Sequence, residues 1–198
     1  FPTRRSSDLG ACNPATDDFL GSSVAVDGDY IAIGAKFADI GGDVDAGAVY
    51  VFEKSGLAWQ QVARLLPSVV AAGGNFGSAV ALSGNLLLIG AEGQDQAFLF
   101  QRIGGSWTEI TGPIVGSDTA GGDSFGASVD IDGTNYVIGA PLNDADGTDA
   151  GAAYLFGAVT TKLVPSDIQI GDLVGASVAI DGTSAIVSAP NEDSGGVD

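Results

Sequence analysis

A glycine-flanked stretch of sequence recurs four times along the 198 residues of the chain. The clearest copy, SFGASVDIDGTNYVIGAP, occupies residues 124–141, and residues 75–91 and 173–190 repeat its pattern. In every copy a second small residue follows the first glycine by 13 positions and is itself followed by alanine. A spacing this constant indicates internal repeats. The first glycines are Gly21, Gly77, Gly126 and Gly175, and the second small residues are Gly34, Gly90, Gly139 and Ser188.

Each copy predicts a tight β-hairpin followed by two further strands. Apolar residues alternate with small ones on both sides of a two-residue turn, and Asp-Gly turns supply the positive φ that such hairpins need. A third apolar run ends at Phe52, Phe100 and Phe156, and a fourth follows, as in AWQQVARLL and SWTEITGPI. Four short strands in about 50 residues are typical of a β-propeller blade. The turns are Asp27–Gly28, Ser83–Gly84, Asp132–Gly133 and Asp181–Gly182.

The predicted fold class is therefore all-β, a fragment of a β-propeller with four-stranded antiparallel blades, of which about three and a half are present. Because propellers close with 4 to 8 blades, this segment is expected not to close on its own. Residues 1–9, FPTRRSSDL, resemble the conceptual translation of a sequencing adapter and are predicted to be an artefact. Residues 10–17 are predicted to be the tail of a preceding blade, and the blades are predicted at 18–74, 75–123, 124–172 and, truncated, 173–198.

The amino-acid composition argues against several classes of function. The chain has 25 acidic and 7 basic residues, a formal net charge of −18, which repels phosphate backbones and argues against a nucleic-acid partner. No apolar run approaches the roughly 20 residues that span a membrane, so no membrane insertion is expected within this segment. Histidine is absent, which excludes a Ser-His-Asp triad and the ordinary zinc sites.

The third copy gives the chain a family resemblance. The sequence FGASVDIDGTNYVIGAP, followed by GAAYLF, resembles the FG-GAP repeat of integrin alpha chains and of many bacterial surface and secreted proteins. The likeness covers residues 18–198 and is weaker in the first and fourth copies, where Leu20, Val174 and Ser188 replace motif residues. The resemblance implies a seven-bladed propeller, an extracellular or cell-surface location, adhesion or protein interaction, and calcium in certain loops.

The loop after the second glycine of the third repeat, LNDADGTDAGA, is a candidate calcium site. Calcium takes six to eight oxygen ligands, and alternating carboxylates in a short flexible loop can supply them. The predicted ligands are Asn143, Asp144, Asp146 and Asp149, although Leu142 stands where integrin-like loops have their first acid. The alternative is a solvated turn whose Asp and Asn side chains cap the backbone of the loop itself.

The other repeats offer weaker loops. In the first repeat, DIGGDVDAG supplies Asp39, Asp43 and Asp45 as predicted calcium ligands. The second repeat has only EGQDQ in a shortened loop and is predicted to bind no metal. In the fourth repeat the weaker candidates are Asn191, Glu192 and Asp193.

Residues that could be mistaken for catalytic groups are explained by the repeat. The hairpin aspartates recur at equivalent turns, whereas a catalytic carboxylate pair must be unique to particular blades. Trp59 and Trp107 both lie seven residues after the repeat phenylalanine and are predicted to pack in the core, with a sugar-stacking platform as the alternative. The anchor glycines are predicted to let neighbouring blades approach closely.

The leading hypothesis is a non-catalytic secreted or surface propeller, stabilised by calcium, that binds a protein or cell-surface ligand. Two alternatives stay open. One is an accessory or catalytic propeller of a secreted hydrolase, since glycosidases need only two carboxylates. The other is a purely structural spacer in a repetitive protein.

Overall fold

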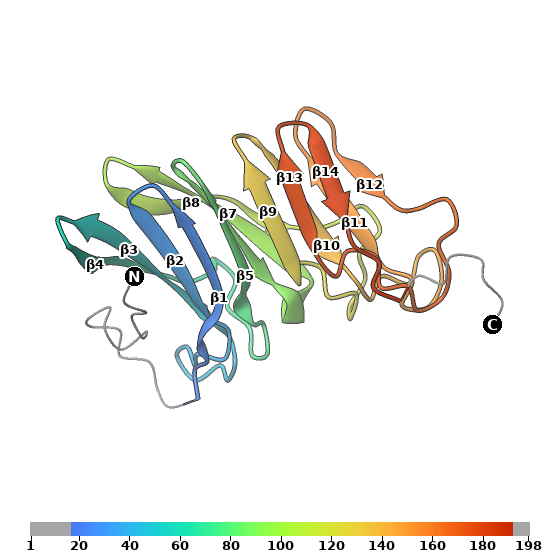
Figure 1. The fold of residues 1–198 in the computed structure, drawn as a ribbon. Helices are drawn as coiled ribbons and strands as arrows, with labels where there is room; N and C mark the ends of the chain where they lie inside the picture. The colour runs from blue at the N-terminus through green and yellow to red at the C-terminus, as the bar shows by residue number, and fades with distance from the viewer. Residues whose placement is uncertain (1–16, 192–198) are drawn as a thin grey trace.

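The computed structural model describes residues 17–191 and places them in three four-stranded antiparallel sheets and one two-stranded hairpin. Figure 1 shows the sheets following one another in chain order, from the blue sheet near the N-terminus to the red hairpin. Consecutive strands pair within every sheet, so each sheet is a simple meander. The prediction of an all-β chain of four-stranded, propeller-type blades is confirmed. Residues 1–9, nearly all of the predicted tail at 10–17, and Glu192 and Asp193 lie outside the described residues.

The elements follow the predicted order within each repeat. The first sheet contains β1 (Leu20–Asp27), β2 (Tyr30–Ala35), β3 (Ala48–Ser55) and β4 (Ala58–Leu65). The second contains β5 (Phe76–Ser83), β6 (Leu86–Ala91), β7 (Gln96–Ile103) and β8 (Ser106–Ile114), with the short 3₁₀ helix η2 (Glu92–Gln94) between β6 and β7. The third contains β9 (Ser128–Asp132), β10 (Asn135–Ala140), β11 (Ala152–Phe156) and β12 (Thr161–Leu163), and the hairpin contains β13 (Val178–Asp181) and β14 (Ser184–Val187).

The anchor glycines are the points where neighbouring sheets touch through their backbones. A Cβ on Gly90 would lie 2.9 Å from the carbonyl carbon of Gly126, and one on Gly139 equally close to that of Gly175. Such distances leave no room for a side chain, because carbon atoms in contact lie about 3.5–4.0 Å apart. The second glycine of one repeat therefore packs on the first glycine of the next, as predicted, and the constant spacing of 13 residues keeps both contacts in register.

The hairpin turns form a second line of contacts between the sheets, at the upper end in Figure 1. The Asp27 carboxylate accepts a hydrogen bond from the N–H of Gly84, at 2.5 Å, in the next turn. Asp132 accepts one from Gly182 at 2.6 Å in the same way. In the second turn a hydroxyl takes this place, and Ser83 Oγ accepts a hydrogen bond from the N–H of Gly133 at 3.0 Å. These contacts support the structural interpretation of Asp27 and Asp132.

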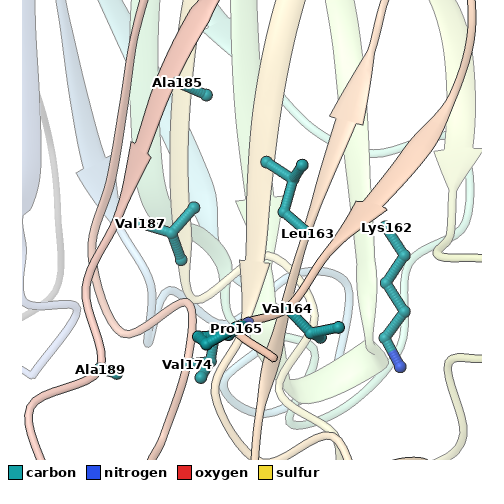
Figure 2. A pocket seen from close by; sticks show the side chains of 8 residues that line it. All are labelled: Lys162, Leu163, Val164, Pro165, Val174, Ala185, Val187 and Ala189. Carbon is teal, nitrogen blue, oxygen red and sulfur yellow. The ribbon is translucent and has the colours of Figure 1, made fainter. Parts of the chain in front are cut away.

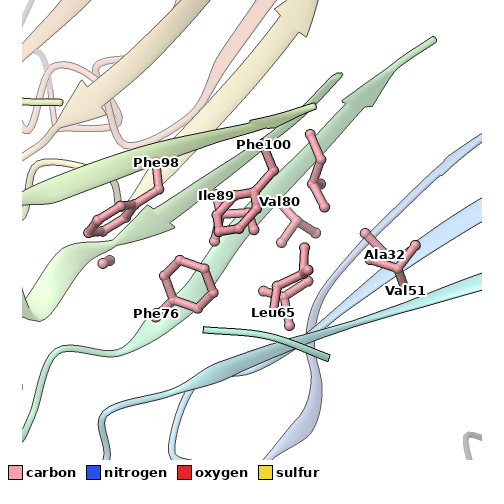
Figure 3. Close-up of a cluster of buried hydrophobic side chains, with 11 residues drawn as sticks. Ala32, Val51, Leu65, Phe76, Val80, Ile89, Phe98 and Phe100 are labelled. Atoms are coloured by element: carbon pink, nitrogen blue, oxygen red, sulfur yellow. The ribbon is translucent and has the colours of Figure 1, made fainter. Parts of the chain in front are cut away.

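Apolar side chains fill the space between the sheets. Phe76 packs edge-on against Phe98 and Phe100, with ring centroids 5.5 and 6.1 Å apart. Figure 3 shows these rings with the aliphatic side chains of the first two sheets around them. Trp107 is half-buried against this cluster and Trp59 against the cluster on the other face of the first sheet, which confirms their predicted packing. Each pair of neighbouring sheets thus buries apolar faces between its members, because a single sheet cannot do so alone.

The third sheet departs from the other two at its outer strand. Strand β12 has three residues, whereas β4 has eight and β8 has nine. Leu163 follows the repeat phenylalanine by seven residues, as Trp59 does, but it is not the structural counterpart of that tryptophan. Leu163 pairs with Ala153 as Leu65 pairs with Val49, whereas Trp59 pairs with Lys54. Lys162, the residue before Leu163, pairs across the sheet with Tyr154 and stands at the edge nearest the acidic loop.

Candidate functional site

The predicted acidic loops all lie at one end of the sheets, the lower end in Figure 1. We call this end the loop face, defined by the loops 36–47, 92–95 and 141–151 and the connectors 66–75, 115–127 and 164–177. Each loop is tied to the connector that leads to the next sheet. The N–H of Gly73 donates to Val44 O at 2.7 Å, and the N–H of Leu173 to Asp149 O at 3.2 Å.

In the first-repeat loop the three predicted calcium ligands do not converge. Asp39 accepts a hydrogen bond from the N–H of Asp45 at 3.0 Å. Asp45 has a left-handed backbone, with φ of 54°, and its carbonyl oxygen accepts from the N–H of Asn75 in the connector. Asp43 is exposed and exchanges backbone hydrogen bonds with Ile40. The carboxylate of Asp39 thus caps the backbone of its own loop, as the alternative interpretation of the third-repeat loop describes for that loop.

The third-repeat loop repeats this geometry. Asp144 accepts a hydrogen bond from the N–H of Asp149 at 2.8 Å, and Asp149 has a φ of 51°. In the second repeat Asp95 has the same left-handed backbone, with φ of 55°. Its carboxylate accepts from the N–H groups of Gly122 and Phe125, at 2.7 and 3.2 Å. An aspartate in this position therefore holds the loop to the following connector in all three sheets.

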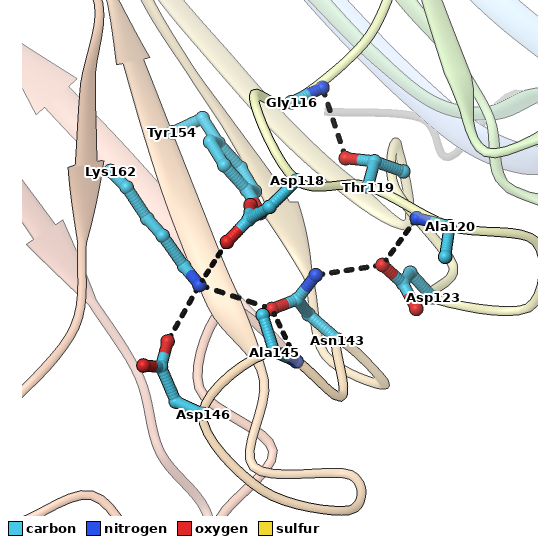
Figure 4. A network of polar contacts seen from close by, with 10 residues as sticks. All are labelled: Gly116, Asp118, Thr119, Ala120, Asp123, Asn143, Ala145, Asp146, Tyr154 and Lys162. Carbon is cyan, nitrogen blue, oxygen red and sulfur yellow. Dashed lines mark hydrogen bonds and ion pairs between the residues drawn. The ribbon is translucent and has the colours of Figure 1, made fainter.

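The remaining predicted ligands, Asn143 and Asp146, meet at the ammonium group of Lys162 (Figure 4). Lys162 Nζ lies 2.6 Å from Asp146 Oδ2 and 3.2 Å from Asn143 Oδ1. It also lies 2.7 Å from Asp118 Oδ2, and the second oxygen of Asp118 accepts a hydrogen bond from the Tyr154 hydroxyl. One lysine from the outer strand thus joins the acidic loop to the connector between the second and third sheets.

The charges in this network stabilise one another. Burial lowers the pKa of Lys162, but hydrogen bonds and charge interactions with Asp118 and Asp146 raise it by more, so the pKa lies above its usual value. Burial raises the pKa of Asp118, but hydrogen bonds from Lys162 and Tyr154 lower it by more, so it lies below its usual value. Burial and the Asp118 carboxylate raise the pKa of Tyr154 far above its usual value. The lysine is therefore charged, Asp118 ionised and Tyr154 a hydrogen-bond donor across the neutral pH range.

A comparison with known families identifies the repeats. A family model described as FG-GAP repeat matches residues 5–52, 59–102, 107–156 and 158–198. The chain belongs to the FG-GAP repeat family. The second and third matches each begin in or beside the outer strand of one sheet and end in the third strand of the next, so each FG-GAP unit includes one contact between blades. The comparison with curated proteins gives no match.

The sequence analysis did not predict that polar side chains of these FG-GAP loops would be buried and hydrogen-bonded to the connectors. Asn143 is fully buried, and its Nδ2 donates to Asp123 Oδ2 at 2.7 Å. Asp123, itself only 3% exposed, also accepts from the N–H of Ala120 at 2.8 Å. Asp172 makes the equivalent contact with the N–H of Gln169 at 2.6 Å. A sequence signal for this role exists, because Asp18, Asp123 and Asp172 each lie three residues before the first anchor glycine.

The described residues bear directly on the metal prediction. Within residues 17–191, no three acidic, cysteine or histidine side chains gather as they would around a metal ion. In the third-repeat loop this arrangement does not fit calcium, because the ammonium of Lys162 already holds the oxygen atoms of Asn143 and Asp146. Calcium binding in the first-repeat loop stays a prediction.

One apolar pocket of about 340 Å³ lies between β12 and β14 (Figure 2). Its lining is aliphatic apart from Lys162, and the carboxylates of the loop face do not contribute to it. In residues 17–191, no helix combines the length and the apolar character needed to cross a bilayer.

Proposed function

We propose that this chain is part of a non-catalytic, secreted or cell-surface propeller module whose loop face binds a basic surface on a protein or cell-surface ligand. The FG-GAP family supports the class of module. The charge of the loop face supports its partner chemistry, since like-signed charges gathered on one face attract oppositely charged ligands and speed their association.

The observation that carries the proposal is the distribution of charge over the loop face. Lys36 is the one basic residue of its loops and connectors, and it is paired with Glu92 at 3.0 Å. Lys162 reaches the face from β12 and is held by Asp118 and Asp146. Nine acidic residues of the loop face are at least partly exposed, namely Asp39, Asp43, Asp45, Glu92, Asp118, Asp144, Asp146, Asp149 and Asp167. Three more, Asp95, Asp123 and Asp172, are buried beneath it.

The contacts of the acidic side chains support a non-catalytic role. Asp27 and Asp132 cap the next hairpin turn, Asp39 and Asp144 cap their own loops, and Asp95 caps a connector. A retaining or inverting hydrolase requires a pair of carboxylates that both face one substrate. Carboxylates used at equivalent positions in successive repeats favour scaffolding over such a pair.

We keep calcium binding by the first-repeat loop as part of this proposal. Asp39 and Asp43 are exposed and Asp45 is partly exposed, and carboxylates in a short loop can supply oxygen ligands to calcium. An ion there would stiffen the face that meets the ligand. The wild-type chain should melt at a higher temperature in Ca²⁺ than in Mg²⁺. The Asp39→Asn, Asp43→Asn double variant should melt at the same temperature in both.

The interaction is tested by panning a displayed library of surface-protein fragments against the 198-residue chain. Selected fragments are then measured for Kd against two charge reversals of equal size. Asp43→Lys changes the loop face, and Asp29→Lys changes an exposed residue within the turn between β1 and β2, at the opposite end. We expect basic fragments whose Kd rises about tenfold or more with Asp43→Lys, one such step being about 1.4 kcal/mol, and changes little with Asp29→Lys.

Other results decide against the proposal. Equal weakening by both substitutions would mean general charge attraction and no loop-face site. A library that yields no saturable binder would favour the structural spacer. Turnover of a glycoside or peptide substrate by the purified chain, lost on substitution of two carboxylates, would establish the hydrolase alternative.

A further inference from the structure

The third-repeat loop contains a cation of its own. The family resemblance leads one to expect calcium among Asn143, Asp144, Asp146 and Asp149, but two of these side chains contact an ammonium group and a third caps a backbone N–H (Figure 4). This disagreement concerns the loop itself and does not depend on the ligand proposed above.

The hydrogen-bonding capacity of Lys162 is fully used. A lysine ammonium has three N–H donors and no acceptor. Three oxygen atoms surround it, those of Asp146 at 2.6 Å, Asp118 at 2.7 Å and Asn143 at 3.2 Å. The Lys162 side chain is only 19% exposed, so it is held within the network and does not extend into solvent.

Electrostatics make the lysine and a calcium ion mutually exclusive. Calcium requires oxygen ligands at 2.3–2.6 Å, and reaching Asp146 and Asn143 at those distances would place a doubly charged ion against the ammonium. Two carboxylates and one ammonium leave the network with a charge of −1, whereas the same carboxylates without the lysine would present −2. The ammonium thus cancels half of the negative charge that would otherwise attract a divalent cation.

The neighbouring sheet provides a natural comparison. Lys162 pairs with Tyr154 across the third sheet, and in the first sheet Arg64 pairs with Tyr50 in the same relation. Arg64 lies over the Tyr50 ring, 5.8 Å from its centroid. A cation at this register therefore reaches the acidic loop in the third repeat and an aromatic face in the first.

We propose that the Lys162 ammonium takes the structural place of a metal ion in the third-repeat loop, so that this FG-GAP loop is ordered without calcium. Removing the lysine should expose Asp118, Asp146 and Asn143 as oxygen ligands and create a divalent-cation site. The lysine acts as an internal counterion, because it pairs with Asp118 in the connector 115–127 and with Asp146 in the loop 141–151.

The test compares Lys162→Met with wild type and with Arg64→Met, in the 198-residue chain. Arg64→Met removes one positive charge at the same register and leaves the third-repeat loop unchanged. Melting is followed in EDTA, in Mg²⁺ and in Ca²⁺ at equal ionic strength, because any divalent ion screens a chain of net charge −18. Terbium luminescence excited through tyrosine reports an ion near Tyr154, whose hydroxyl contacts Asp118.

In EDTA, Lys162→Met should melt about 2–6 °C below wild type, as expected for a small network of partly buried ion pairs in a chain of this length. It should regain stability in Ca²⁺ beyond the gain in Mg²⁺ and acquire a tyrosine-sensitised terbium signal, and Arg64→Met should do neither. Lys162→Arg, which keeps the charge, should behave as wild type in all three solutions.

Two results would overturn the inference. The first is a wild-type chain whose melting temperature rises specifically in Ca²⁺, if that rise is still seen in the Asp39→Asn, Asp43→Asn double variant and is lost in the Asp146→Asn variant. The other is a Lys162→Met chain that melts in EDTA as wild type does. If Lys162→Met does not fold, the Asp146→Asn variant takes its place and should melt below wild type in EDTA. An Asp146→Asn chain that melts in EDTA as wild type does would equally contradict the structural role of the Lys162 ammonium.

Discussion

The contact between anchor glycines makes the strongest prediction about stability. Gly90 is buried in β6, and its φ is not in the left-handed region, so alanine is compatible with its backbone. The obstacle is the neighbouring sheet. A methyl group there would lie 2.9 Å from the carbonyl carbon of Gly126, 3.2 Å from its Cα, and closer still to the carbonyl oxygen.

The size of the effect follows from these distances. Non-bonded carbon atoms in contact lie about 3.5–4.0 Å apart. The second and third sheets must therefore separate by at least about 0.6 Å where the backbone of Gly90 meets the backbone of Gly126. Overpacking costs typically 1–3 kcal/mol, and backbone cannot rotate away as a side chain can, so Gly90→Ala should cost about 3 kcal/mol. For a chain of this size that is a fall of about 6–12 °C in melting temperature.

Gly121→Ala is the matched control for this prediction. Gly121 is exposed, a Cβ there meets nothing within 4 Å, and its φ is also outside the left-handed region. The loss of glycine freedom in the unfolded chain should make this variant neutral or more stable by about 0.4–1 kcal/mol. Thermal melting by circular dichroism compares the two. If Gly90→Ala and Gly121→Ala had the same melting temperature, the interpretation that the anchor glycines permit backbone contact between sheets would be refuted.

Further predictions concern the turns and the lysine network. Asp132→Ala removes the acceptor for the N–H of Gly182 and should cost about 0.5–1.5 kcal/mol, measured by urea unfolding. Asp181→Ala, at an equivalent turn, should lower the free energy of unfolding by less. Equal losses would mean that these aspartates stabilise only their own turns and that the contact of Asp132 with the next turn contributes nothing. The pKa of Asp118 is lowered by folding, so its contribution is present above about pH 4 and is lost as the pH falls further. The pKa of Lys162 is raised, so its contribution is present below about pH 10 and is lost as the pH rises through the raised value. The stability difference between wild type and Lys162→Met should therefore be level between these limits and shrink at both ends, and a difference that persists unchanged at pH 3 would contradict the ion pairs.

The fold could be predicted because its determinants are local and repeated. Asp-Gly turns, alternating apolar residues and the spacing of 13 residues each specify a hairpin within a single copy. The role of the anchor glycines also followed from the repeat, since a residue without a side chain at the same place in successive sheets implies close approach.

The candidate site could be predicted only in part. The sequence identified the acidic loops, and the left-handed aspartates Asp45 and Asp149 lie in them. It did not separate a metal ligand from a backbone cap, because the same side-chain oxygen serves both. Lys162 lies 44 residues from Asp118 and 16 from Asp146, and only the pairing of β11 with β12 brings it to both.

The most direct test of the lysine as internal cation is a crystal structure of the wild-type chain grown in millimolar calcium. The account predicts Lys162 Nζ within hydrogen-bond distance of Asp118, Asn143 and Asp146, with no metal density among them. Calcium coordinated by Asp146 and Asn143, with the Lys162 side chain turned out into solvent, would contradict it.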